Sequence, residues 1–124
     1  MSRFVSTESV RLDLSDGDWI EIKRELSYGD MQAVVSQTRG DFTASEINLV
    51  AAYLLDWSFK DAHDKPVVIE SDAQKLAALR NLTQASFREI DAAIETHAKG
   101  VAEAKKPKAE SGRRKSARIS ASAA

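Results

Sequence analysis

The two histidines are the first residues to weigh for chemistry, because an imidazole can act as a base or as a metal ligand. His63 stands between Asp61 and Asp64, so nitrogen and oxygen donors are close together in the sequence. The chain has no cysteine, which excludes disulfides and thiolate zinc sites. Since no second histidine is near and Asp and His are common in turns, we interpret this cluster as a polar turn. His97 falls among apolar positions of a helical segment, where we expect a rim residue rather than a base.

Other catalytic patterns are missing from the sequence. The five glycines are scattered singly, so no glycine-rich phosphate loop is present. No serine stands in a nucleophile-elbow pattern. The many carboxylates are not flanked by apolar residues in a way that would raise a pKa. We therefore expect a protein that is not an enzyme, with no catalytic residue, no cofactor and no metal.

Charge is divided unevenly along the chain. Residues 104–124 hold seven basic residues and one acid, a balance of +6, whereas residues 1–103 hold 11 basic and 18 acidic residues, a balance of −7. The basic end is nearly free of large apolar side chains and cannot offset its ordering entropy, so we expect residues 104–124 to be disordered. A solubilising tail is favoured over a contact for nucleic acid or an acidic partner, and no aromatic residue is interleaved to stack on bases.

The sequence gives no sign of export or membrane insertion. Its longest apolar run, residues 47–55, has nine residues, whereas a membrane-spanning helix needs about 20. The first ten residues lack the apolar core of a secretory signal. We expect a soluble protein without membrane contact.

Residues 9–24 predict a β-hairpin, because apolar and polar residues alternate on both sides of a turn. A three-residue loop, 15–17, pairs Leu12 with Ile20 and Val10 with Ile22, and it puts Gly17 at the left-handed position. A two-residue loop would set Leu12 opposite Glu21 and is rejected. Residues 1–8 are expected to be a flexible N-terminus.

The first helix is predicted to begin after Ser27, which can act as the N-cap with Asp30 in the first turn. Met31, Val34 and Val35 then form a short apolar stripe.

A second helix is predicted over residues 44–56. Thr43 and Glu46 form a T-x-x-E capping box directly before the apolar run. The alanines and leucines of that run favour helix, and its lack of a polar face predicts the central, most buried helix. Trp57 with Phe59 is expected to fold back as a lid. The expected core and lid residues are Ile47, Leu54, Leu55 and Trp57.

Two more helices complete the expected architecture. Ser71 and Gln74 form an S-x-x-Q box that opens a helix to about Leu82, and Thr83 caps a last helix over 84–103. The last helix carries apolar or rim positions spaced three and four residues apart. These positions are Phe87, Ile90, Ile94, His97 and Val101. They either pack on the chain's own core or form a seam for a partner, and both alternatives remain open.

These elements predict the α+β class: an N-terminal β-hairpin packed on a small bundle of about four helices, followed by a disordered basic tail. We expect residues 9–103 to form a single globular domain.

Two phrases of the sequence resemble a known family. They are "DGDWIEIK" at 16–23 and "YLLDWSFKD" at 53–61, set within "RLDLSDGDWIEIKRELSYGD" and "VAAYLLDWSFKDAHDKPVVI". In this order and spacing, they resemble the small tail assembly chaperones of long-tailed bacteriophages. The resemblance covers roughly residues 9–97.

The resemblance implies a chaperone of the host cell cytoplasm that is absent from the mature virion. Such proteins bind the tape measure protein in repeated copies and help recruit tail tube protein, so a homo-oligomer or multiple copies on the partner are compatible with the role. It makes Phe87, Ile90, Ile94 and Val101 candidate partner contacts. Two alternatives are a structural virion component, such as a connector or minor tail protein, and a small nucleic-acid-associated protein acting through residues 105–118.

Overall fold

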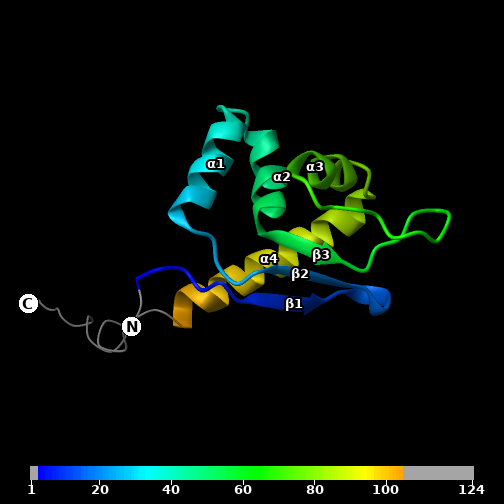
Figure 1. Cartoon of the computed structure of the whole chain (residues 1–124), viewed down its shortest axis with the longest axis horizontal. Helices are drawn as coiled ribbons and strands as arrows, with labels where there is room; N and C mark the ends of the chain where they lie inside the picture. Colours follow the sequence, from blue (N-terminus) through cyan, green and yellow to red (C-terminus); the bar gives the residue numbers. More distant parts are fainter. Residues whose placement is uncertain (1–2, 105–124) are drawn as a thin grey trace, which may run out of the picture.

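A computed structural model describes residues 3–104 of the chain, apart from the side chains of Phe42 and Thr43 (Figure 1). It confirms the α+β class, with a three-stranded antiparallel sheet and four α-helices in this part of the chain. The elements in order are β1 (Ser9–Asp13), a 3-10 turn η1 (Ser15–Gly17), β2 (Trp19–Lys23), α1 (Tyr28–Thr38), α2 (Phe42–Tyr53), β3 (Leu54–Trp57), α3 (Asp72–Arg80) and α4 (Gln84–Ala104). The predicted disordered tail lies outside the described residues from 105 onward.

The predicted hairpin is confirmed in position and register. Val10 pairs with Ile22 and Leu12 with Ile20 across β1 and β2. The Leu14 N–H donates to the Asp18 carbonyl at 2.8 Å and closes the three-residue loop. Gly17 has φ +78° in that loop, as the left-handed position requires.

The predicted helix over 44–56 is wrong at both ends. Helix α2 begins at Phe42, so Thr43 lies inside the first turn and is not the N-cap. The helix ends at Tyr53, and the chain passes directly into β3, which pairs with β2. Leu54 pairs with Ile22 and Trp57 with Ile20. Pairing with an available sheet edge has overridden the helix preference of the leucines.

A β-bulge in β3 explains why Leu55 is not the core residue that the sequence predicts. Asp56 pairs with Glu21 and Leu54 with Ile22, so Leu55 is an extra residue without a partner on β2. Its side chain is 39% exposed, whereas Leu54 is fully buried. The bulge also lets Leu54 and Trp57, three residues apart, both bury their side chains.

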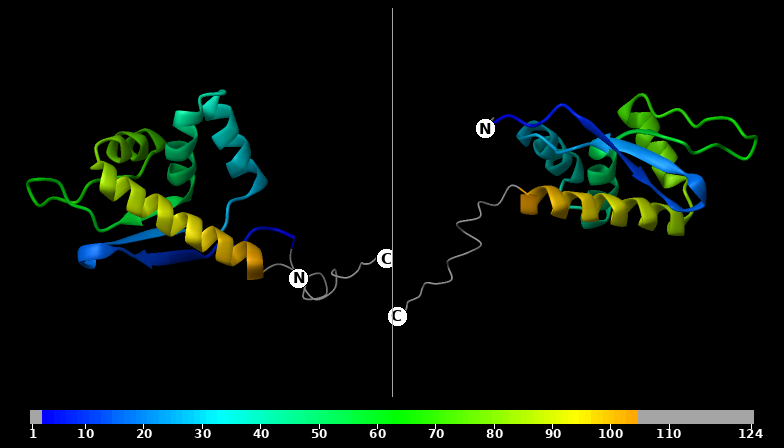
Figure 2. Two further views of the ribbon diagram at one scale, coloured as in Figure 1. Left: turned by 180° about the vertical axis from the view of Figure 1, so that it is seen from behind. Right: turned by 90° about the horizontal axis from the view of Figure 1, so that it is seen from below.

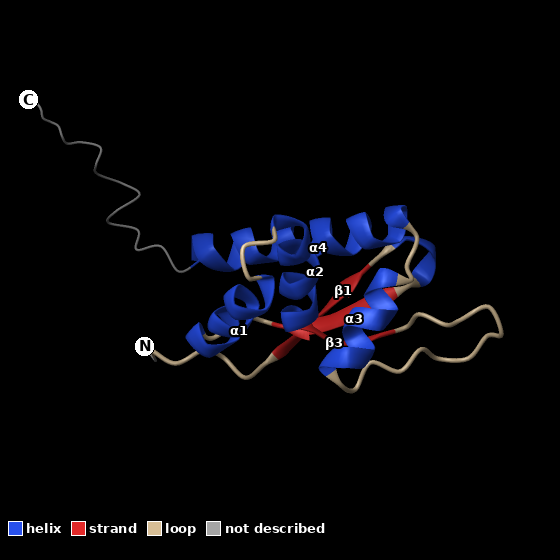
Figure 3. Cartoon of the chain, turned by 90° about the horizontal axis from the view of Figure 1, so that it is seen from above, coloured by secondary structure: helices blue, strands red, loops and turns tan. Residues whose placement is uncertain are grey.

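The core lies between the sheet and the helices that cover one of its faces. Helix α4 runs diagonally across the sheet (Figure 2, left), and α2 stands on β3 between α1 and α3 (Figures 1 and 3). One cluster of buried side chains joins these elements: Ile20, Ile22, Val50, Tyr53, Leu54, Trp57, Ile69, Leu79, Ile90 and Ile94. Ile47 packs against this cluster from a half-buried position.

Trp57 belongs to the core, as predicted, and it also anchors the loop before α3. Its ring lies 4.9 Å from that of Phe59. Its indole N–H donates to the Val67 carbonyl at 3.0 Å, and Val67 N–H donates back to the Phe59 carbonyl at 3.2 Å. The polar turn expected around His63 is therefore the tip of a loop that folds back on itself.

Three helix starts follow the sequence prediction. Ser27 with Asp30 and Ser71 with Gln74 form complete capping boxes. The Thr83 hydroxyl accepts from the Ser86 N–H at 3.1 Å at the start of α4. Helix α3 ends at Arg80, two residues before the predicted end. Among residues 3–104, no helix is both long enough and apolar enough to cross a bilayer.

Candidate protein-binding surface

The two family-like phrases meet in space, because they form β2 and β3. The Trp19 N–H donates to the Ser58 hydroxyl at 2.9 Å, and this hydroxyl donates to an Asp18 carboxylate oxygen at 2.9 Å. The Ser58 N–H donates to the Trp19 carbonyl at 3.1 Å. Asp18 and Trp19 of the first phrase are thus hydrogen-bonded to Ser58 of the second phrase. These bonds join the start of β2 to the residue that follows β3.

The four predicted partner contacts on α4 divide into two groups. Ile90 and Ile94 are 0% and 3% exposed, and they pack in the chain's own core. In this fold they are not available to a partner, which favours the core alternative for these two positions. Phe87 and Val101 are half-buried.

Phe87 also lines an open groove between α2, α3 and α4. The groove has a volume of about 470 Å³ and includes Ile47 and Leu82 on its apolar side. Arg88 closes one end through an ion pair with Glu46. The groove therefore offers a small apolar surface beside a charge pair that is already satisfied.

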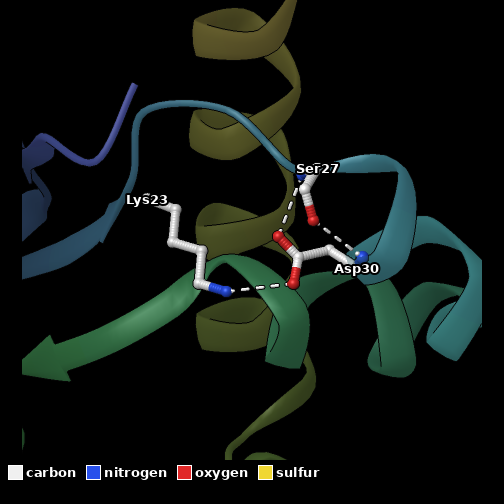
Figure 4. Close-up of polar contacts among 3 residues, drawn as sticks. All are labelled: Lys23, Ser27 and Asp30. Carbon is white, nitrogen blue, oxygen red and sulfur yellow. Dashed lines mark hydrogen bonds and ion pairs between the residues drawn. The ribbon is translucent and has the colours of Figure 1, made fainter. Parts of the chain in front are cut away.

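A smaller polar cavity of about 220 Å³ lies between α1, α2 and α3. Lys23 Nζ bonds to an Asp30 carboxylate oxygen at 3.2 Å there, and Asp30 also accepts from the Ser27 N–H at 2.9 Å (Figure 4). The Ser27 hydrogen bond is the main cause that lowers the pKa of Asp30; Lys23 adds to the shift and partial burial opposes it. Burial lowers the pKa of Lys75, which Asp72 partly offsets.

The groups that line the polar cavity connect α1 to the rest of the fold. Two lysines and two aspartates line the cavity, so their charges balance: Lys23, Lys75, Asp30 and Asp72. Asn48, which is 6% exposed, donates to the Thr38 hydroxyl at 3.4 Å. Ion pairs and hydrogen bonds thus join the inner side of α1 to β2 and α2. Two other groups have shifted pKa values: burial raises those of Tyr53 and Asp91.

The two histidines occupy structural positions. Asp61 accepts hydrogen bonds from the N–H groups of His63 and Lys65, at 2.8 and 3.1 Å, which is the pattern of an aspartate that holds a turn. His97 Nε2 lies 2.8 Å from the Arg24 carbonyl. Within residues 3–104, no group of three or more His, Cys, Asp or Glu side chains is placed to hold a metal ion.

Helix α1 carries an exposed apolar surface, to which the sequence analysis assigned no role. Tyr28, Met31 and Val35 are 80%, 41% and 67% exposed. Their spacing of three and four residues puts them on one side of the helix, and we call this surface the α1 stripe. Only Val34 of α1 is buried, at 7%. The apolar residues of α1 are therefore divided between the buried Val34 and the exposed α1 stripe.

The hollow at the α1 stripe is lined by uncharged residues. Gln32 and Ser36 complete the shallow hollow that Tyr28, Met31 and Val35 line. An apolar, uncharged helix face on an otherwise acidic body is typical of a protein-binding site. No sequence signal separates this surface from a core-facing stripe, because residues spaced three and four apart also form the usual apolar face of a buried helix.

Comparison of the chain with protein-family models, with curated proteins and with solved structures returned no match in any of the three.

Proposed function

We propose that this chain is a tail assembly chaperone of a long-tailed bacteriophage, which acts in the host cell cytoplasm. In this proposal it binds the tape measure protein and helps to recruit tail tube subunits. The resemblance of the segments 16–23 and 53–61 to that family is the starting point. Support comes from the pairing of the two segments as neighbouring strands, because they act together as one unit of the fold.

The α1 stripe is the observation that carries the proposal. A helix face with side chains at positions i, i+3 and i+7 fits against an apolar face of another helix. By the family resemblance, the partner is a long helical protein with such faces. Tyr28 is the expected anchor, because large aromatic side chains dominate protein interfaces.

The acidic body fits the same role. Residues 1–103 carry a net charge of −7, which residues 104–124 reduce to −1 for the whole chain. Copies bound along one apolar partner would therefore each present an acidic domain, and acidic domains repel one another, which disfavours aggregation.

Co-expression with the tape measure protein of the same phage tests the proposal. We expect affinity-tagged wild-type chain to retain the partner, and V35Q and Y28S to retain it about tenfold less, since each removes an apolar contact of interface size. V68Q is the matched control, because Val68 is also an exposed valine, 53% exposed against 67% for Val35, in the loop before α3. Equal retention by wild type, V35Q and Y28S would contradict the proposal.

Purified phage particles separate this proposal from its structural alternative. A chaperone leaves before the particle is complete, so we expect no copies of this chain in mature virions by mass spectrometry. A connector or minor tail protein would be present at a fixed copy number.

A further inference from the structure

The outer edge of the sheet at β1 has no neighbouring strand within the described part of the chain. The strand order β1-β2-β3 places β1 at one edge. Seen from below (Figure 2, right), β1 passes in front of β2, and α4 runs beside it. Such an edge offers a row of main-chain donors and acceptors to another strand.

The hydrogen bonds of the hairpin show which residues point to that edge. Arg24 N–H donates to the Glu8 carbonyl and Leu14 N–H to the Asp18 carbonyl, so the even-numbered residues of β1 bond to β2. In an antiparallel pair, the residues between them direct their N–H and C=O groups away from the partner strand. The outward residues are therefore Ser9, Arg11 and Asp13.

We propose that β1 is a self-association edge, where two copies of this chain pair antiparallel about a two-fold axis at Leu12. Arg11 of each copy then stands opposite Asp13 of the other. The outward N–H and C=O groups of Arg11 and Asp13 form the main-chain bonds, and the two sheets become one continuous sheet with three strands from each copy.

Charge and apolar character select this register. With the axis at Leu12, two Arg11–Asp13 pairs form on the open face of the sheet. On the helix-covered face, Leu12 meets Leu12 and Val10 meets Leu14 of the second copy, and all of these side chains are only half-buried in one copy. Moving the axis to Arg11 or to Asp13 sets like charges directly opposite each other, which is destabilising.

Charged side chains on an edge strand normally prevent pairing with another strand. The proposed dimer therefore depends on whether Arg11 and Asp13 are free to pair with the opposite charges of a second copy. Neither Arg11 nor Asp13 forms an ion pair within residues 3–104. The Arg11 guanidinium lies 3.9 Å above the ring of Trp19, which holds it on the open face. Both charges thus remain available for a second copy in the one register that makes them complementary.

Charge exchange tests the register in the full chain. Sedimentation should show a concentration-dependent dimer for the wild type. R11D and D13R each replace two symmetric attractions with two repulsions, so we expect the dimer dissociation constant to rise roughly tenfold to hundredfold. The double variant R11D/D13R has the wild-type net charge and restores both attractions, and it should dimerise again. V35Q should stay dimeric, because the α1 stripe takes no part.

Single cysteines give a second readout, since the chain has none of its own. Facing residues of a pair that is not hydrogen-bonded have Cα atoms about 4.5 Å apart, within disulfide range. L12C is therefore expected to form a disulfide-linked dimer under mild oxidation. L14C is the matched control and should not, because Leu14 faces Val10.

Three results would overturn the proposal: a wild type that stays monomeric at millimolar concentration, a dimer that survives R11D and D13R, or a loss of dimer that the double variant does not reverse. Retention of the tape measure protein is measured separately and is independent of all three.

Discussion

At the scale of single residues, Ser58 joins the two segments 16–23 and 53–61, which lie far apart in the sequence. Its hydroxyl accepts from the Trp19 N–H and donates to Asp18, so one oxygen satisfies the backbone of β2 and fixes the end of the hairpin loop. The bulge at Leu55 places Ser58 at this point, since it sets the register of every later residue of β3.

We expect S58A to lower the free energy of unfolding by about 1–2 kcal/mol, because a partly buried N–H loses its acceptor. Urea unfolding followed by tryptophan fluorescence measures this. S36A is the control: Ser36 is an exposed serine of α1, and its replacement should change stability by less than about 0.5 kcal/mol. Equal stability of S58A and S36A would show that the junction does not depend on the hydroxyl.

Asp30 gives the fold a pH-dependent contribution that can be isolated. The pKa of its carboxyl is lowered from the ordinary value of 3.8, chiefly by the Ser27 N–H, so the unfolded chain binds this proton more readily than the folded chain. Its contribution is therefore complete above the unfolded pKa of 3.8 and is lost as the pH falls through the lower folded pKa.

We expect D30N to be less stable than the wild type by about 1 kcal/mol at pH 7, because it removes the negative charge of the capping box at the helix N-terminus and the ion pair with Lys23. The difference should shrink as the pH is lowered below 3.8. Urea unfolding of both proteins at a series of pH values between 7 and 3 measures it. A difference that is constant over this range would rule out the carboxylate as its source.

At the scale of elements, the sequence predicts those features that short-range chemistry decides. The hairpin register follows from alternation and from one glycine, and three helix starts follow from Ser27, Ser71 and Thr83. Strand β3 could not be predicted in this way. Helix α2 ends at Tyr53 and β3 begins at Leu54, with no turn residue between them. Leu54 is a strand residue because it pairs with the edge of β2, about 30 residues earlier in the chain, and no local sequence signal shows this pairing.

The same reasoning explains why the candidate surface was missed. On α1, Met31, Val34 and Val35 lie on neighbouring parts of one side of the helix, so their spacing alone does not show which of them turns toward the core. The choice is made by contacts with α2 and by the Lys23–Asp30 ion pair, which turn Val34 inward. On α4, the sequence left two alternatives open, a core face and a seam for a partner. The packing of α4 on the sheet buries Ile90 and Ile94, which favours the core alternative at these two positions.

Two adjacent valines of α1 separate stability from binding. V34A should lower the free energy of unfolding by about 1–2 kcal/mol, since Val34 is 7% exposed and loses two buried methyl groups. V35A should change it by less than about 0.5 kcal/mol, because Val35 is 67% exposed. Thermal and urea unfolding of the two variants measures this. Equal destabilisation by both would mean that the α1 stripe is covered within the chain itself.

At the scale of the whole molecule, the buried core and the segment with an excess of positive charge are separate. Every residue of the core cluster lies between Ile20 and Ile94, whereas residues 104–124 carry the balance of +6. The proposed chaperone role assigns binding to the α1 stripe, and the nucleic-acid alternative assigns it to residues 105–118. Removing the basic segment therefore distinguishes the two functions without touching the core.

We expect a chain that ends at Ala104 to unfold at the same urea concentration as the full chain and to retain the tape measure protein equally well, because its core and its α1 stripe are intact. Neither chain should bind duplex DNA specifically. If binding were carried by the basic segment, DNA affinity of the full chain would fall steeply with salt, since each phosphate contact releases a counterion, and it would vanish on truncation. That result, together with undiminished binding by Y28S, would transfer the function from the α1 stripe to residues 105–118.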